Sequence, residues 1–147
     1  MNDKDDVLVS RFWFEQIDPK LWFEKSASFD QRVAMLFRDK VDQALAGQLN
    51  VWGTQARSAL SLIVVLDQFT RNIYRDKPLA FAGDALALNL SLRALEQGWV
   101  HDEPEVARRK FFLLPMMHSE SLLIQQASLP LFKTLTDENT YTFAVKH

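Results

Sequence analysis

Polar side chains that could bind a ligand are concentrated in the sequence LDQFTRNIYR, residues 66–75, directly after an apolar run. At the roughly 100° between successive residues of an α-helix, these side chains share one arc of the helix surface. The arc consists of Asp67, Gln68, Arg71, Asn72 and Arg75. An arginine offers a planar fork that matches a carboxylate or phosphate, and an acid and amides beside it can orient such a group. The segment therefore predicts a polar ligand-binding pocket, with Asp67, Gln68, Arg71 and Asn72 as its residues.

The same side chains could instead serve the fold. Asp67 and Arg71 are four positions apart, so on a helix they can form an ion pair. Together with Gln68 and Asn72 they would then link this helix end to its neighbours and satisfy loop carbonyl groups. The number of hydrogen-bonding side chains on one arc exceeds what capping requires, and this excess is the argument for a pocket. The sequence leaves both interpretations open.

A second polar cluster, MMHSE, follows Pro115. Histidine can carry a proton near neutral pH or bind a metal, and a carboxylate in the first turn of a helix is favoured by the helix dipole. Inside one regular helix His118 and Glu120 would point apart, so they converge only if His118 lies in the turn before the next helix. His118 and Glu120 are the candidate catalytic residues, and His118 is also a candidate ligand-binding residue. The alternative is a histidine bonded to a backbone carbonyl.

The sequence predicts neither a metal site nor a cofactor. It contains no cysteine, and His101 and His147 do not form a ligand pattern such as HxxxH with His118. The residue types of a hydrolytic triad are present as Ser119, His118 and Asp67, but no GxSxG-like motif accompanies them.

Apolar residues recur at helical spacing along most of the chain, so both clusters are expected on or beside helices. The clearest helix is expected to begin with a capping box at Ser28 and Gln31 and to end at Gly47. The apolar run over residues 59–66 could by itself be a buried strand. No turn residue separates it from the polar segment, so it is expected to belong to a helix that continues to about Arg75.

The remaining elements are also expected to be helical. We expect Thr54 to cap the helix that carries the first polar cluster. The other expected elements are a short helix over residues 7–14, one from Asp76 to Gly98, one from Asp102 to Pro115, one from about Ser119 to Leu135 with a kink or shortening at Pro130, and a last stretch capped by Asp137. The aromatic residues Phe12, Trp13, Phe14, Trp22 and Phe23 could form a peptide-binding stripe, or close the first hairpin over the core.

The composition is that of an ordinary globular protein and excludes several classes. The 147 residues are 48% hydrophobic and 24% charged, which suits one domain over residues 1–147. A net charge of −2 without a basic block argues against nucleic-acid binding. No apolar run approaches the ~20 residues that span a membrane. The absence of cysteine and an acidic N-terminal segment without the pattern of a signal peptide favour a cytoplasmic location.

Four motifs in the same order resemble those of the bacterial family of unknown function DUF924. They are the pair RFWFE and LWFEK, then LDQFTRNIYR, then AFAGDALAL, and finally FFLLPMMHSESLLIQQ. The resemblance runs from about Val7 to His147 and implies an all-α fold of antiparallel helical hairpins, grouped with tetratricopeptide-like proteins, with six to seven helices. It implies no established activity.

The chain departs from the family pattern at two places. Thr70 stands where members commonly have proline, so the helix there is expected to be straighter. Members typically continue beyond the residues that match Ala144–His147 into a segment with arginine and histidine, so the C-terminal part of the family pattern is expected to be absent from this sequence.

Two functional hypotheses follow. The first is a binding module whose helical surface or polar pocket holds a peptide, a partner protein or a small anionic ligand. The second is an enzyme, most simply a hydrolase, with His118 as acid or base and Arg71 as the anion clamp. No cofactor, nucleic acid or membrane partner is expected, and the sequence does not predict the oligomeric state.

Overall fold

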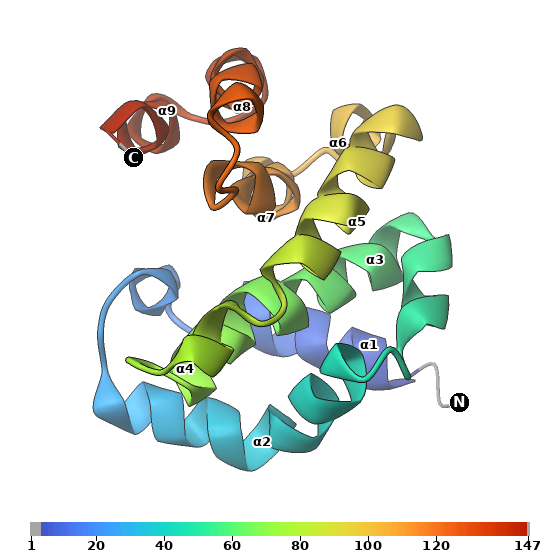
Figure 1. Ribbon diagram of the computed structural model, residues 1–147, viewed down its shortest axis with the longest axis vertical. Helices are drawn as coiled ribbons and strands as arrows, with labels where there is room; N and C mark the ends of the chain where they lie inside the picture. Colours follow the sequence, from blue (N-terminus) through green and yellow to red (C-terminus); the bar gives the residue numbers. More distant parts are fainter. Residues whose placement is uncertain (1–3, 147) are drawn as a thin grey trace. The chain divides into compact units, whose positions relative to one another are not determined.

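The computed structural model describes residues 4–146, which form two compact units divided between Gly83 and Asp84 (Figure 1). The described residues are all-α and contain no strand, as the sequence predicts. The expected six to seven helices are not confirmed, because the α-helical segments of the described residues run from α1 to α9 and are interspersed with short 3-10 and π turns. The single domain over residues 1–147 stays a prediction. Within the described part of the chain, no helix has the length and apolar character needed to cross a bilayer.

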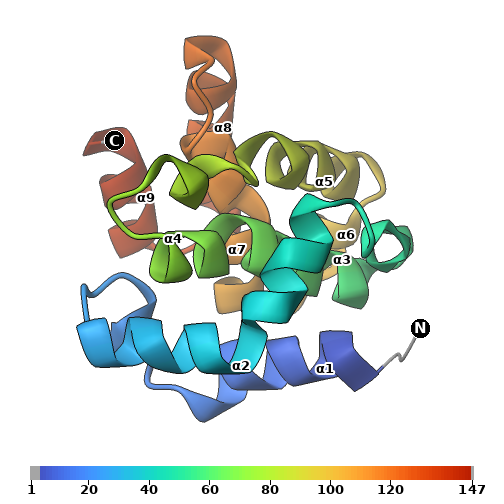
Figure 2. The same ribbon diagram turned by 60° about the horizontal axis from the view of Figure 1, so that its bottom comes forward.

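The first unit consists of α1 Lys4–Arg11, the π turn η1 Phe12–Gln16, the 3-10 turn η2 Pro19–Trp22, α2 Ala27–Leu45, the 3-10 turn η3 Asn50–Thr54, α3 Ala56–Ile63, the π-helical segment η4 Val64–Phe69, α4 Thr70–Ile73 and the 3-10 turn η5 Pro78–Phe81. In this unit α2 packs against η4 and α4, and α1 packs against α3. Figure 2 shows α4 beside α2, against which it packs.

Aromatic rings hold the first unit together. Phe12 and Trp13 of η1 are buried, and both meet the ring of Phe69, at centroid distances of 6.1 and 5.6 Å. Phe37 of α2 stacks on the same Phe69 ring at 4.8 Å. Each buried aromatic ring contributes roughly 1.5–3 kcal/mol. Phe12 and Trp13 are therefore core residues rather than a peptide-binding stripe, whereas Phe23 is 55% exposed.

The segment from Ala56 to Ile73 is helical throughout, as predicted, and the strand alternative for residues 59–66 is wrong. The helix is not regular, because η4 replaces α-helical with π-helical bonding directly before Thr70. The sequence did not predict this π-helical segment, and the expectation that Thr70 leaves the helix straighter than a proline would stays a prediction. The Thr70 hydroxyl is buried and donates to the carbonyl of Leu66 at 2.8 Å.

Two predicted caps are displaced. The second helix is capped by Ser26, whose hydroxyl accepts from the N–H of Phe29 at 3.2 Å, while Ser28 lies inside the helix. Ser26 and Ser28 are both serines at a plausible start, so the sequence could not choose between them. Thr54 does not cap α3, because its hydroxyl donates to the Val51 carbonyl instead.

The helix expected from Asp76 to Gly98 is interrupted. It is divided into η5 and α5, with a break at Ala82 and Gly83. A Cβ atom on Gly83 would lie 2.3 Å from the carbonyl oxygen of Leu66, so the backbone approaches η4 too closely for any side chain. The break is therefore imposed by tertiary packing.

The second unit consists of α5 Asp84–Glu96, α6 Trp99–Asp102, α7 Val106–Met117, α8 Leu122–Leu135 and α9 Glu138–Lys146. Here α7 packs against α5 and α8, and α8 packs against α9 (Figure 1). Pro115 does not end its helix, as the sequence had suggested, but lies within the last turns of α7. Proline supplies no N–H to the helix. Three residues before Pro115, the carbonyl of Phe112 accepts a hydrogen bond from the buried Ser91 hydroxyl of α5 at 2.5 Å.

The end of α8 and the start of α9 follow the sequence closely. Pro130 lies inside α8 without shortening it, and the helix reaches Leu135 as expected. Asp137 caps α9 as predicted, because its carboxylate accepts from the Thr140 N–H at 2.7 Å.

Candidate functional site

Asp67 and Gln68 lie in the π-helical segment η4 and are both buried, with 1% and 6% of their surface exposed. The Gln68 amide donates to the Asp67 carboxylate at 2.7 Å. π-Helical segments are rare and occur frequently at functional sites, because they reorient side chains within a helix. The first polar cluster therefore begins with a buried carboxylate fixed in orientation by its neighbour.

Arg71 lies on α4, one turn after Asp67, and forms the ion pair that the spacing predicts. Its Nη1 donates to the backbone carbonyl of Asp67 at 2.7 Å and to the Asp67 carboxylate at 3.3 Å. The guanidinium also lies over the ring of Phe81, 5.3 Å from the centroid, which is a cation–π distance. The Arg71 side chain remains 24% exposed, and Phe81 is 61% exposed. A buried acid thus holds a partly exposed guanidinium against an exposed aromatic ring.

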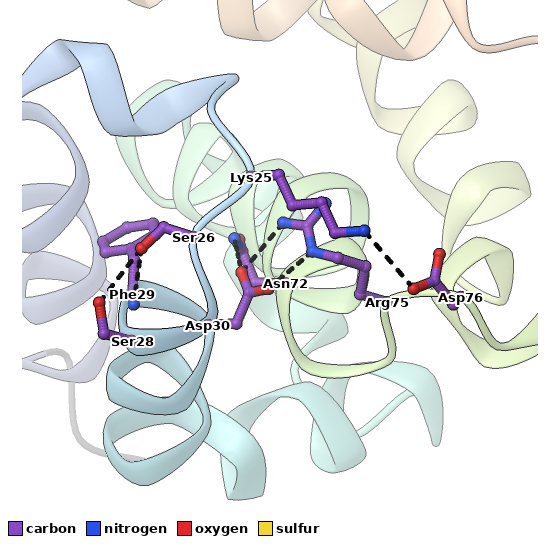
Figure 3. A network of polar contacts seen from close by, with 8 residues as sticks. All are labelled: Lys25, Ser26, Ser28, Phe29, Asp30, Asn72, Arg75 and Asp76. Atoms are coloured by element: carbon purple, nitrogen blue, oxygen red, sulfur yellow. Dashed lines mark hydrogen bonds and ion pairs between the residues drawn. The ribbon is translucent and has the colours of Figure 1, made fainter.

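Asn72 belongs to a different contact. It donates to the carboxylate of Asp30 on α2 at 2.9 Å, and Arg75 binds the same carboxylate through Nε at 2.6 Å and Nη2 at 3.0 Å (Figure 3). This network links two elements 42 or more positions apart in sequence. Asn72 therefore fits the interpretation that these side chains serve the fold, because it contacts an acid of a neighbouring helix and is only 7% exposed.

The contacts between Asp30, Asn72 and Arg75 shift the pKa of Asp30 and the pKa of Arg75. Partial burial disfavours the carboxylate, but the hydrogen bonds from Arg75 and Asn72 outweigh it and hold the pKa of Asp30 below its ordinary value. The hydrogen bond from Arg75 to Asp30 raises the pKa of Arg75, against the opposing effect of burial. Asp30 and Arg75 are therefore both charged at neutral pH.

Asp30 was not among the site residues predicted from the sequence, although a signal was present. Asp30 follows core residue Phe29 in the first turn of α2, and on a helical wheel it lies on the buried side beside Val33 and Phe37. An acid on the apolar face of a helix requires a partner, and Arg75 is that partner. Figure 3 also shows Lys25 beside Asp76, an exposed pair with 3.9 Å between Nζ and Oδ2.

His118 and Glu120 belong to the second unit. His118 is the C-terminal cap of α7, where its backbone N–H donates to the Leu114 carbonyl at 3.1 Å, and it is partly buried. Glu120 is exposed and precedes Ser121, the N-cap of α8. His118 therefore lies before the next helix, as its proposed role required, but Glu120 is not the first-turn carboxylate that was expected.

Across residues 4–146, no group of three or more His, Asp or Glu side chains could hold a metal ion. The candidate residues fall into two sets. Asp67, Gln68, Arg71 and Asn72 lie close together in the first unit, whereas His118 and Glu120 lie in the second unit.

Comparison with known proteins places the chain in a family. The model of the family described as bacterial protein of unknown function, DUF924, matches residues 9–147. A solved structure of a protein of unknown function from Agrobacterium tumefaciens is similar, with 32% sequence identity and a TM-score of 0.90. The similarity covers 98% of this chain and 80% of the Agrobacterium chain. No curated protein matches. The family match over nearly all of the sequence, together with the shared all-α fold, shows that this chain belongs to the DUF924 family.

Proposed function

We propose that the protein is a helical binding module that holds an anionic group, a carboxylate or phosphate, at Arg71 and Arg75. One observation supports this proposal above the others. Arg71 lies on α4 and Arg75 in the turn directly after it, their side chains are 24% and 31% exposed, and each is oriented by an acid that is more deeply buried. Each arginine presents a planar fork of donors that matches a carboxylate or phosphate, so two arginines close together in the chain can offer several donors to one anion.

The acids below the arginines provide orientation. Asp67 and Asp30 have side-chain exposures of 1% and 15%, so the arginines are more accessible than their partners. A guanidinium that is already oriented loses less conformational entropy when it binds an anion. The two carboxylates also offset part of the positive charge, so the affinity should be modest and fall with added salt.

Phe81 favours one chemical class of ligand. Its ring is exposed and lies under the Arg71 guanidinium, so an apolar group attached to the anion would pack beside the charge. A small carboxylate or phosphate ester with an apolar substituent, or an acidic peptide with an aromatic or aliphatic neighbour, fits this combination. In this proposal Asp67 and Gln68 orient Arg71, and Asn72 positions Arg75 through Asp30.

The proposal also includes the expected hairpin arrangement and the expected cytoplasmic location. The packing of α7 on α8 and of α8 on α9 supports the tetratricopeptide-like hairpin arrangement. The absence of cysteine supports action in the cytoplasm. The hydrolase alternative, with His118 as acid or base and Arg71 as the anion clamp, stays a prediction, and no contact within either unit favours it over binding.

A thermal-shift screen tests the proposal. A ligand that binds only the folded protein raises the melting temperature, by an amount that grows with its concentration. Phosphate, phenyl phosphate, benzoate and acetate are compared at equal ionic strength. We expect phenyl phosphate and benzoate to stabilise the protein more than phosphate and acetate.

Substitutions locate the effect. Arg71→Ala should abolish the shift, while Arg93→Ala, which removes an exposed arginine of α5, should leave it unchanged. Equal shifts in Arg71→Ala and the unmodified protein would contradict the proposal.

A further inference from the structure

The outward face of α2 carries a stripe of exposed residues at helical spacing. We call Ser28, Arg32, Met35, Leu36 and Asp39 the α2 stripe. At 100° per residue these positions lie within about 100° of arc. Met35 is 87% exposed, more than any other large hydrophobic residue in the described chain, and Leu36 is 55% exposed. An exposed apolar pair at the centre of a long helix is a feature of interaction surfaces.

The charged residues of α2 that turn toward neighbouring elements have partners. Asp30 binds Arg75, Lys40 binds Asp5 of α1 at 2.9 Å, and Asp42 accepts from the Tyr74 hydroxyl at 2.9 Å. Within residues 4–146, Arg32 and Asp39 of the α2 stripe have no ion-pair partner. The described contact of Arg32 is with the ring of Phe12, 5.2 Å from the centroid.

We propose that the α2 stripe is a self-association surface whose partner is a second copy of this chain. Arg32 lies three residues before Met35, and Asp39 lies three residues after Leu36. If two α2 helices pack antiparallel about a twofold axis between Met35 and Leu36, Arg32 of each copy faces Asp39 of the other. The stripe is complementary to itself, as a twofold symmetric interface requires.

The surface beside the stripe can receive an apolar side chain. An open hollow of about 480 Å³ adjoins it. The hollow is lined by Phe12, Gln16, Ser28, Gln31, Arg32, Met35 and Leu36. Methionine is flexible enough to fill an irregular space of this kind, so Met35 of the second copy can occupy the hollow.

The size of the stripe sets the strength of association. From Ser28 to Asp39 it extends about 16 Å along the helix. One helix face of this length is smaller than the roughly 800 Å² per partner of a stable complex. The structure therefore implies a weak dimer that forms as the protein concentration rises.

Sedimentation equilibrium at protein concentrations from about 10 µM to about 1 mM tests this inference. The range brackets the dissociation constants of weak complexes. We expect a shift from monomer to dimer across the range. Met35→Glu should weaken the dimer at least tenfold, because it buries a charge at the centre of the interface. The matched control is Leu123→Glu on α8, which changes a 79% exposed residue outside the stripe and should leave association unchanged.

Exchanging the two charges of the stripe distinguishes the twofold symmetric pairing from non-specific association. Arg32→Asp and Asp39→Arg should each weaken the dimer, because like charges then face each other across the axis. The double variant Arg32→Asp with Asp39→Arg should restore it, although it lacks the contact of Arg32 with Phe12. A protein that stays monomeric at all concentrations, a dimer that Met35→Glu does not weaken, or a double variant as weak as the single ones would overturn the inference. Circular dichroism of each variant verifies that its helices are intact.

Discussion

Two aspartates of the first unit each hold an arginine, and they do so for different purposes. Asp67 pairs with Arg71 four positions away on the same helix, while Asp30 pairs with Arg75 across 45 positions of sequence. An ion pair within one helix orients a side chain, and one between helices joins two elements. The Asp30–Arg75 pair therefore joins α2 to the turn after α4 and also orients Arg75 for the proposed site, whereas the Asp67–Arg71 pair orients Arg71 within one helix.

Replacing Asp30 tests its role in joining α2 to α4. Asp30→Ala removes the acceptor of the bonds from Arg75 and Asn72 and should lower the free energy of unfolding by about 1.5–3 kcal/mol, the range for hydrogen bonds to charged groups. Urea unfolding at low protein concentration measures the loss. Asp39→Ala, on the exposed face of the same helix, is the control and should change stability by less than about 0.5 kcal/mol. Equal losses in the two variants would show that Asp30 does not join the helices.

The pairing of Asp67 with Arg71 was predictable at residue scale, because the spacing of four fixes it once the segment is helical. The partner of Asn72 was not, since Asp30 lies on another helix and one sequence contains no record of which helices pack together. Glu120 was placed in the wrong position for a related reason. Ser119 and Ser121 are both plausible caps, and only Ser121 accepts from an N–H of α8, that of Ile124.

At the scale of elements, η4 and the break before α5 are linked. Gly83 approaches the Leu66 carbonyl of η4 so closely that a Cβ atom would lie 2.3 Å away. The same carbonyl accepts the Thr70 hydroxyl. The irregular helix and the glycine therefore fit each other.

Gly83→Ala tests this close approach. The added methyl group collides with backbone rather than with a movable side chain, so the free energy of unfolding should fall by about 2–4 kcal/mol. Gly47→Ala is the comparison, because a Cβ there meets only side-chain atoms of Asn50 at 3.5 and 4.0 Å, and its φ of +81° should cost only about 1 kcal/mol. A Gly83→Ala protein as stable as Gly47→Ala would show that the two segments separate readily.

The existence of the helices was predictable from periodicity, and their interruptions were not. The apolar run from Ala59 to Leu66 is helical, as expected from its continuation into a polar helical segment without an intervening turn residue. Nothing in its residue types indicates that Val64–Phe69 is π-helical. Pro115 usually marks a helix end, but here the helix continues through it. In each case tertiary packing outweighs local preference.

For the whole molecule, the all-α class was predictable because composition and period agree along the chain. The division between Gly83 and Asp84 was not, since the residues before it were expected to continue one helix to Gly98. A division of this kind depends on which helices contact one another, and apolar spacing does not encode that choice.

Acid pH should destabilise the protein through Asp30. Its pKa lies below the ordinary value of 3.8, so its contribution to stability is present above that value and is lost as the pH falls through the lower pKa of the folded state. Asp137, whose pKa is lowered by its bonds to Thr140 and by Lys110 against the effect of burial, contributes with the same sign. Urea unfolding between about pH 2 and about pH 5 should show stability rising with pH, and Asp30→Asn should reduce the slope. An unchanged slope in Asp30→Asn would show that Asp30 is not selectively stabilised in the folded state.

If Arg71 and Arg75 receive an anion, a titration observed at the arginine side chains detects the binding directly. In ¹⁵N-labelled protein, the Nε–Hε signals of Arg71 and Arg75 are followed as phenyl phosphate is added at constant ionic strength, with Arg93 as the internal reference. We expect the Arg71 and Arg75 signals to shift along one saturable curve while that of Arg93 stays in place. Shifts that do not saturate, or that are equal at all three arginines, would contradict it.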